Sequence, residues 1–324
     1  MRTFAHFNPR TVEEAAMVLK RYDGKAKVIA GGTDILGKLK DEVLPVYPEA
    51  LVNIKSIDGL DFIEATSEGL SIGALTRLQD VADNGLVKKS YQALAQGAAK
   101  TASPHLRAMG TIGGNISQDI RCWYYRNANN RFPCLRKGGG RCYAIEGDNR
   151  FHSIFGGSVE KGCYAVHPSD TAPALIVLDG SIVTNKRTLK AEDFFAVSVR
   201  RTTVLEPDEI ITHITVPPPK TGTKSAFLKF ALRKSIDFPI VNCAARVATS
   251  KGIVRSARIC LNAVFVIPYQ ARAAEDYMVG KALTEENAQA AADLAVANSK
   301  PMSRNTYMVQ IAKTMVKRAL LACT

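Results

Sequence analysis

Four of the seven cysteines gather in one segment, and a set of four thiols can bind a metal. Cys122, Cys134, Cys142 and Cys163 span 42 residues, with eleven, seven and twenty residues between them. Four thiolates are a usual ligand set of structural zinc and of iron–sulfur clusters. The close C-x-x-C pairs of zinc ribbons are missing, which favours a cluster over zinc. Unligated thiols remain an alternative, and two disulfides would need an oxidising compartment.

The segment that carries these cysteines is basic. Residues 121–161 contain eight Lys and Arg side chains against three Asp and Glu side chains, a net charge of +5. A [4Fe–4S] cluster held by four thiolates is negatively charged, so a basic surround would stabilise it. A solvated basic loop explains the same composition, and the charge alone does not separate the two interpretations.

Two pairs of adjacent glycines indicate a second kind of chemistry, the binding of phosphate. Gly31 and Gly32 follow a short apolar run, and Gly113 and Gly114 follow a helix-like segment. Glycine leaves no side chain in front of its N–H group, and such turns bind phosphate oxygens through main-chain donors. Two of them could hold the two phosphates of a dinucleotide. Plain tight turns are the alternative, and neither a Rossmann nor a P-loop motif occurs.

Strands and helices alternate through the first hundred residues, which predicts an α/β layer there. The apolar runs at 26–30, 50–54 and 70–74 are typical of strands. Thr11 followed by Glu14 predicts a capped helix that ends before Gly24. Helical spacing continues between about 75 and 103.

The regular pattern is lost from Gly110 to about Asp170 and then returns. A loop of this length inside a compact domain is usually functional. A helix and a strand resume at 167–183, and three prolines at 217–219 indicate a boundary or an exposed turn. From about residue 205 onward we predict an α+β unit with a hairpin across 250–252 and closing helices at 284–299 and 305–322.

Length and composition predict about two globular domains. The 324 residues are 46% hydrophobic and 23% charged, which excludes wholesale disorder. No apolar run reaches the roughly 18 residues that a membrane span needs, so we expect none. No apolar leader is visible, so we expect a cytoplasmic location, or a periplasmic one only through export together with a partner.

The net charge of +13 leaves two interpretations open. Nucleic-acid binding is disfavoured, because the basic residues are scattered and the single Trp offers little surface for stacking on bases. An ordinary basic protein and a protein with an acidic partner both fit the charge.

Four motifs, taken in order, resemble the FAD-binding (medium) subunit of the molybdenum hydroxylases, the xanthine dehydrogenase family. They are VIAGGTDIL (28–36), SPHLRAMGTIGGNI (103–116), HPSDTAPALIVLD (167–179) and ALRKSIDFPIVNCAA (231–245). The resemblance covers nearly the whole chain. The cysteine segment resembles the extra [4Fe–4S] loop of some members, such as the 4-hydroxybenzoyl-CoA reductase beta subunit and the FAD subunit of bacterial aldehyde oxidoreductases.

The resemblance implies an α+β fold with two domains. Residues 1–203 would form a two-part FAD-binding domain of the PCMH/VAO type, with the [4Fe–4S] insertion at about 120–165. Residues 204–324 would form an α+β domain of the CO dehydrogenase flavoprotein C-terminal type. The four clustered cysteines would be the cluster ligands. The implied flavin contacts are Lys27, Val28, Ile29, Ala30, Gly31, Gly32, Thr33, Asp34, Thr101, Thr111, Ile112, Gly113, Gly114, Asn115, Asp170 and Lys229.

The resemblance also implies an oxidoreductase subunit that transfers electrons without itself transforming the organic substrate. Molybdopterin would lie in a large partner subunit and the [2Fe–2S] clusters in a small one, because no further cysteine set occurs here. The external carrier would be ferredoxin, NAD(P) or a quinone, and the substrate an aromatic acyl-CoA, an aldehyde or an N-heterocycle. The assembly would be a dimer of heterotrimers. The competing interpretation is a zinc-stabilised basic binding protein without redox function.

Overall fold

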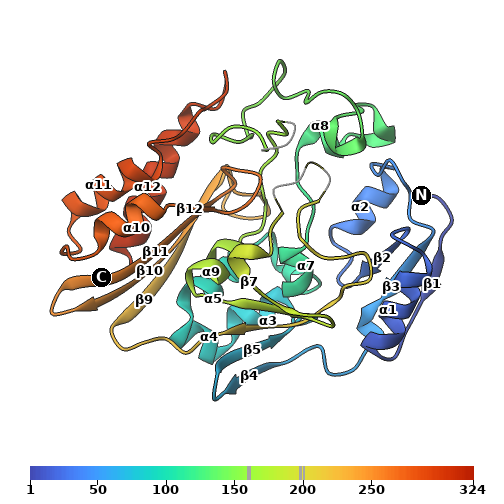
Figure 1. The fold of residues 1–324 in the computed structure, drawn as a ribbon, viewed down its shortest axis with the longest axis horizontal. Coiled ribbons are helices and arrows are strands. Elements are labelled where there is room, and N and C mark those ends of the chain that lie inside the picture. Colours follow the sequence, from blue (N-terminus) through green and yellow to red (C-terminus); the bar gives the residue numbers. More distant parts are fainter. Residues whose placement is uncertain (159–161, 197–198, 200) are drawn as a thin grey trace.

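The structure is a computed structural model that describes residues 1–158, 162–196, 199 and 201–324. Three β-sheets with their helices follow one another, from the N-terminal part at the right of Figure 1 to the C-terminal part at the left. This arrangement confirms the predicted α+β class. In the part of the chain that is described, no helix is both long and apolar enough to cross a lipid bilayer.

The N-terminal part is a three-stranded parallel sheet with the order β1-β3-β2. Its strands are Ala5–Phe7 (β1), Ala26–Ile29 (β2) and Ala50–Asn53 (β3). Helix α1 (Val12–Arg21) packs Ala15 and Leu19 against this sheet, and its N-cap Thr11 accepts a hydrogen bond from the Glu14 N–H, as predicted. Helix α2 (Ile35–Lys40) follows β2, and the 3-10 turn η1 (Ile54–Ser56) follows β3.

The middle part is a five-stranded antiparallel sheet with the order β4-β5-β8-β6-β7. Its strands are Ile63–Thr66 (β4), Gly69–Gly73 (β5), Ser181–Thr184 (β6), Thr188–Lys190 (β7) and Ile211–Val216 (β8). Helix α9 (Ala172–Val177) leads into β6, as the sequence predicts, and η4 (Ala191–Asp193) follows β7. Strand β8 completes this sheet although it follows residue 204, and the division of the chain at 203/204 stays a prediction.

The helical segment predicted over 75–103 is divided into three helices. They are Leu78–Asp83 (α3), Gly85–Ser90 (α4) and Gln92–Ala99 (α5). Asn84 ends α3 and caps α4, because its side chain accepts hydrogen bonds from the N–H groups of Leu86 and Val87. The apolar spacing correctly predicted helical structure in this segment. The N-cap residue inside it divides the helix that the spacing suggested. The short helices Pro104–Arg107 (α6) and Ile112–Ile116 (α7) follow.

The C-terminal part is a four-stranded antiparallel sheet with the order β12-β11-β10-β9. Its strands are Thr223–Phe230 (β9), Val241–Ser250 (β10), Ile253–Asn262 (β11) and Tyr269–Gln270 (β12). Lys251 and Gly252, with φ of +51° and +76°, make the two-residue turn of the predicted hairpin. The helices are Arg272–Met278 (α10), Glu285–Ala295 (α11) and Tyr307–Leu321 (α12), of which α10 was not predicted.

The cysteine-rich segment lies between α7 and α9 and forms the upper loops of Figure 1. Its described residues contain one short helix, α8 (Trp123–Arg126), and the 3-10 turns η2 (Ala128–Asn130) and η3 (Leu135–Lys137). This confirms the predicted loss of regular structure. Below, residues 120–165 are called the insert.

The middle and C-terminal parts share one hydrophobic core. Ile72, Leu175 and Ile214 of the middle part belong to the same buried cluster as Phe227 and Cys260 of the C-terminal sheet. Helix α5 contacts β9, so it joins the two parts. The C-terminal part therefore supports the middle part, which in turn carries one wall of the site described next.

Candidate functional site

The first glycine pair lies in the loop between β2 and α2. A Cβ atom on Gly31 would lie 2.0 Å from the carbonyl oxygen of Met109, so this loop touches the chain before α7 through its backbone. Gly32 has a φ of +73°, which side chains disfavour. Both positions therefore require glycine, one for close approach and one for its backbone angle.

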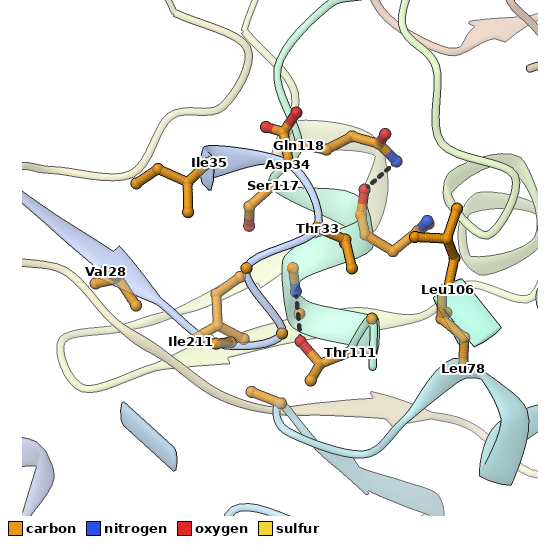
Figure 2. Close-up of a pocket in the computed structure, with 18 of the residues that line it drawn as sticks. Val28, Thr33, Asp34, Ile35, Leu78, Leu106, Thr111, Ser117, Gln118 and Ile211 are labelled. Atoms are coloured by element: carbon orange, nitrogen blue, oxygen red, sulfur yellow. Dashed lines mark hydrogen bonds between the residues drawn. The ribbon is translucent and has the colours of Figure 1, made fainter. Parts of the chain in front are cut away.

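The second glycine pair lies inside α7 rather than in a free turn. Thr111 is the N-cap of this helix, and its hydroxyl oxygen accepts a hydrogen bond from the Gly114 N–H at 3.2 Å (Figure 2). A Cβ on Gly113 would lie 2.9 Å from the carbonyl oxygen of Ala74. This glycine pair thus lets a short helix pack directly on the chain that follows β5.

A cavity of about 460 Å³ opens between the two glycine segments (Figure 2). Its volume is in the range of cofactor sites, roughly 300 to 1,000 Å³. We call it the dinucleotide cavity. Twelve of the sixteen residues named above as flavin contacts line it: Lys27, Val28, Ala30, Gly31, Gly32, Thr33, Asp34, Thr101, Thr111, Gly113, Gly114 and Asn115.

The other four predicted contacts are not among the residues that line this cavity. Ile29 ends β2, and Ile112 is fully buried in the core of the middle part. Asp170 and Lys229 form a buried ion pair, with 2.7 Å between Oδ2 and Nζ. That these sixteen residues contact a flavin stays a prediction.

Buried polar groups connect the wall of the cavity to this ion pair. The hydroxyl groups of Ser169 and Thr171 both donate to Asn115 Oδ1, at 2.6 and 2.7 Å, and fix the Asn115 amide at the cavity wall. Asp170, between them, also accepts a hydrogen bond from Asn242 Nδ2 at 2.7 Å. Burial raises the pKa of Asp170, while Lys229 and Asn242 oppose this effect.

The sequence analysis missed cationic side chains that line the same cavity. Lys38 Nζ lies 3.4 Å from Asp34 Oδ2, and Arg121 Nη2 lies 2.9 Å from Asp34 Oδ1. Burial opposes ionisation of Asp34, but Lys38, Arg126 and Arg121 outweigh it and lower the pKa of Asp34. The i,i+4 spacing of Asp34 and Lys38 was the sequence signal for one of these contacts. Around Asp34, cations outnumber carboxylates, which suits an anionic ligand.

Apolar residues that the sequence analysis also missed line the cavity at the loop between β9 and β10. Ile236 and Phe238 of this loop line it and are 51% and 45% exposed, and the Arg121 guanidinium lies 4.6 Å from the Phe238 ring centroid. Leu106 contributes from α6. The cavity thus combines polar backbone and cations with apolar side chains, as sites for nucleotide cofactors do.

The four cysteines of the insert surround a second cavity, of about 10 Å³, which we call the cysteine cavity. All four are free thiols; Cys134 and Cys163 are buried, and Cys122 and Cys142 are half-buried. In their present side-chain positions, the described residues contain no group of three or more Cys, His, Asp or Glu side chains that could hold a metal ion. The fold gathers the predicted ligands, while their binding of a cluster stays a prediction.

The surroundings of the cysteine cavity combine protonated thiols with buried cations. Burial raises the pKa of Cys122 to about 12 and that of Cys163 to about 11. Lys137 Nζ is buried and has no hydrogen-bond partner within the described chain. Burial lowers the pKa of Lys137, and Cys134 and Cys122 oppose this effect. Arg136 lines the cavity as well.

A charged network connects the two cavities. The Asp119 carboxylate accepts hydrogen bonds from Tyr125 Oη at 2.5 Å and from Arg136 Nη2 at 3.2 Å. The Asp119 N–H donates to Asp34 Oδ2 at 3.1 Å, and Arg126 Nη2 donates to Asp34 Oδ1 at 2.6 Å. Together with Arg121, four side chains of the insert therefore bind Asp34 or Asp119. Of these two carboxylates, Asp34 lines the dinucleotide cavity.

Two known families match successive parts of the chain. The family described as the FAD binding domain in molybdopterin dehydrogenase matches residues 2–219. The family described as the CO dehydrogenase flavoprotein C-terminal domain matches residues 226–323. The first match covers more than half of the chain. It contains the residues that line the cysteine cavity and those that line the dinucleotide cavity, apart from Ile236 and Phe238.

Several known proteins are similar to this chain over nearly its full length. The chain is 34% identical to the aldehyde oxidoreductase FAD-binding subunit PaoB of Escherichia coli (strain K12), over 99% of this chain and 98% of that protein. It is 29% identical to the carbon monoxide dehydrogenase medium chain of Hydrogenophaga pseudoflava, over 98% and 96%. A solved structure of carbon monoxide dehydrogenase from the same organism matches with a TM-score of 0.79 and 28% identity, over 99% and 97%. The chain therefore belongs to the family of FAD-binding subunits of the molybdopterin dehydrogenases.

Proposed function

We propose that the chain carries FAD and a [4Fe–4S] cluster and transfers electrons within a molybdenum-dependent hydroxylase or dehydrogenase complex. It would pass them between the molybdenum and [2Fe–2S] centres of its partners and an external carrier. The observation that carries this proposal is the pairing of a dinucleotide-sized cavity with four free cysteines, joined by one charged network.

The residues of the dinucleotide cavity suit the diphosphate of FAD. Gly31 and Gly32 present backbone without side chains at the cavity wall, and Lys38 and Arg121 supply positive charge there. The N–H groups of Gly113 and Gly114 are already bound within the chain, by Ala74 O and Thr111 Oγ1. The apolar side chains of Ile236 and Phe238 suit a flat aromatic ring system. A bound flavin exchanges two electrons with a nucleotide or quinone and single electrons with an iron–sulfur centre.

The cysteine cavity has the donor atoms and the positive charge that an anionic cluster needs. Cys122, Cys134, Cys142 and Cys163 supply four sulfur donors, and the buried Lys137 ammonium has no acceptor among the described residues. The ammonium lies 5.8 Å from the centroid of the Tyr125 ring but has no counter-ion among the described residues, so an anion at this position would stabilise it. A [4Fe–4S] cluster held by four thiolates is such an anion and exchanges single electrons.

Binding of a cluster requires local rearrangement and proton loss. The cavity of about 10 Å³ is smaller than a cubane cluster, so the cysteine side chains have to turn to open it. The thiols also have to lose their protons. The raised pKa values of Cys122 and Cys163 oppose this loss, and binding to metal ions favours it. The insert is rich in loops and short turns, which allows such a rearrangement.

The remaining cofactors would belong to partner subunits. Burial raises the pKa of Cys243, Cys260 and Cys323, which lie in the cores of the middle and C-terminal parts. Three cysteines are in any case too few for a [2Fe–2S] cluster held by four cysteines. The name medium chain, which two relatives carry, supports partners of larger and smaller size. We propose that the larger partner carries molybdopterin and the smaller one the [2Fe–2S] clusters, in a dimer of heterotrimers.

The organic substrate would be selected by the molybdenum-bearing partner rather than by this chain. Relatives of similar length are named for an aldehyde, nicotinate and carbon monoxide. One subunit fold thus serves unrelated substrates. We propose an aldehyde, an aromatic acyl-CoA or an N-heterocycle as substrate and ferredoxin, NAD(P) or a quinone as carrier. The cytoplasmic location stays a prediction.

A cysteine substitution tests this proposal. In the complex purified without oxygen, Cys134→Ser should remove about four iron atoms per chain and leave FAD bound, because the cluster needs four thiolates. Cys323→Ser is the matched control, since Cys323 lies in the C-terminal core and should not affect the iron content. Iron and flavin are measured by metal analysis and absorption. Unchanged iron in Cys134→Ser, or zinc in its place in the parent protein, would contradict the proposal.

A further inference from the structure

A third cavity lies where the middle part meets the C-terminal sheet. Its volume is about 270 Å³, and we call it the junction cavity. One wall includes residues 89–92, where α4 ends and α5 begins, and residues 217–220, the proline-rich connection after β8. The other wall comes from β9, β10 and β11. The described residues that line it are different from those that line the dinucleotide and cysteine cavities, so it is a separate site.

Positive charge converges on the junction cavity from several segments of the chain. Four cationic side chains line it, those of Lys89, Lys220, Lys224 and Arg246. Among the described residues that line it, Asp179 supplies the only carboxylate. Groups that carry the same charge and lie around one cavity repel one another, and a bound anion would offset this repulsion.

The one carboxylate of the cavity does not neutralise its lysines. Asp179 Oδ2 forms an ion pair with Arg246 Nη1 at 2.5 Å, and Asp179 Oδ1 lies 3.4 Å from Arg258 Nη2. Lys89 and Lys220 form no ion pair with any described residue. These two ammonium groups are therefore available to a ligand.

A buried hydroxyl group at the wall of the junction cavity has an unused hydrogen. Ser225 lines the cavity and is 6% exposed. Its oxygen accepts a hydrogen bond from the Ala93 N–H at 3.2 Å, but its hydrogen has no acceptor among the described residues. The N–H of Gln92, at the start of α5, also has no partner in the described chain. Two neutral donors thus accompany the cations, a combination that suits an oxyanion.

We propose that the junction cavity binds a phosphate group, either of free phosphate or of a small phosphate monoester. A phosphate group carries between one and two negative charges at neutral pH and has several acceptor oxygens, which match the surplus of cations and donors. The volume is smaller than that of the dinucleotide cavity and suits a small ligand. Because both parts of the chain line the cavity, the bound group would also hold the middle part against the C-terminal sheet. The inference goes beyond the proposed function and needs neither FAD nor a cluster.

Binding of inorganic phosphate to the intact complex, with its FAD bound, tests the inference. Isothermal titration calorimetry at neutral pH and about 0.15 M salt should show saturable binding that is not simple screening of charge. Lys89→Gln/Lys220→Gln should raise the Kd at least tenfold, because two charge-assisted hydrogen bonds, each of about 1.5 to 3 kcal/mol, are removed. Both lysines are exposed, so this double variant should fold as the parent protein does.

The matched control is Lys20→Gln, which removes an exposed lysine of α1 in the N-terminal part. It should bind phosphate with the Kd of the parent protein. No saturable binding to the parent protein, or the same Kd in the parent protein and the double lysine variant, would overturn the inference.

A second measurement follows thermal unfolding in the same samples. Phosphate should raise the unfolding midpoint of the parent complex and of Lys20→Gln, since a ligand that binds only the folded state stabilises it. The double lysine variant should show a much smaller rise. FAD is measured in every sample, so that displacement of the flavin by phosphate is recognised. An equal rise in all three proteins would show that phosphate acts elsewhere and would overturn the inference.

Glycerol 3-phosphate distinguishes the two sources of the phosphate group. If it binds more tightly than inorganic phosphate, the site belongs to a phosphate monoester, and the opposite order assigns it to free phosphate. Acetate is the comparison for charge, because it carries one negative charge and two oxygens. Acetate binding as tight as that of phosphate would overturn the assignment of a phosphate group.

Discussion

Single residues decide how closely the two glycine segments approach each other. A Cβ on Gly31 would lie 2.0 Å from the Met109 carbonyl oxygen, whereas nothing lies within 4 Å of a Cβ on Gly37 in the helix that follows. The two glycines are six residues apart but differ in what surrounds them. The sequence predicted that Gly31 matters, because adjacent glycines rarely occur without a backbone reason. It did not indicate that the reason is contact with Met109.

Gly31→Ala should separate the two walls of the dinucleotide cavity. We expect a destabilisation of about 1 to 3 kcal/mol, since the methyl group has to displace backbone, and a loss of bound FAD. Gly37→Ala is the matched control and should keep its FAD, with a stability equal to or slightly above that of the parent protein. FAD per chain and the thermal unfolding midpoint measure both effects. Full FAD content and an unchanged midpoint in Gly31→Ala would refute this account of the contact.

At the scale of elements, charge anchors the insert to the FAD-binding part. Tyr125 and Arg136 bind the Asp119 carboxylate, and Arg126 binds Asp34. Burial opposes ionisation of Asp119, but Lys38, Arg136 and Arg126 outweigh it and hold the pKa of Asp119 well below its usual range. The insert and the cavity wall are therefore stabilised together by an ionised Asp119.

The stability of the fold should consequently decrease in acid because of Asp119. Its folded-state pKa lies below the unfolded value of 3.8, so its ionised form stabilises the fold above that pH, and this contribution is lost as the pH falls below about 4. The Asp119→Asn variant should be less stable than the parent protein at pH 7, and its stability should decrease less on acidification. The urea unfolding midpoint from pH 7 to pH 3 measures this.

The matched control for Asp119 is Asp58→Asn, at an exposed position. It should follow the pH dependence of the parent protein. If the Asp119→Asn profile ran parallel to that of the parent protein, the charged network would not anchor the insert as described.

At the scale of the whole molecule, one buried ion pair joins the middle part to the C-terminal sheet. Lys229 of β9 and Asp170 have side chains that are 7% and 3% exposed, and Asn242 of β10 binds the other oxygen of the carboxylate. The pair lies behind Asn115, which lines the dinucleotide cavity. The two predicted domains therefore meet through buried charge as well as through a shared core.

Lys229→Met should destabilise the chain by about 3 to 5 kcal/mol, because the Asp170 carboxylate is left buried without its cation. The double variant Asp170→Asn/Lys229→Met removes both charges and should recover a large part of the loss. Urea unfolding of the two variants and the parent protein measures the difference. Equal losses in the single and the double variant would show that the buried charge is not the cause.

The sequence by itself determined the features that depend on neighbouring residues. The Thr11 cap and the Lys251–Gly252 turn follow from hydrogen bonds and backbone angles within a few residues. The order of four motifs predicted the family, which the comparisons confirm.

Only the tertiary structure decided which distant residues meet. Asp119 binds Asp34 across 85 residues, and Lys229 binds Asp170 across 59. Nothing local predicts such pairs, because a charge accepts a buried position only where packing elsewhere supplies its partner. The same reason explains why Arg121 escaped the sequence analysis, because its role depends on the residues that the fold brings against it.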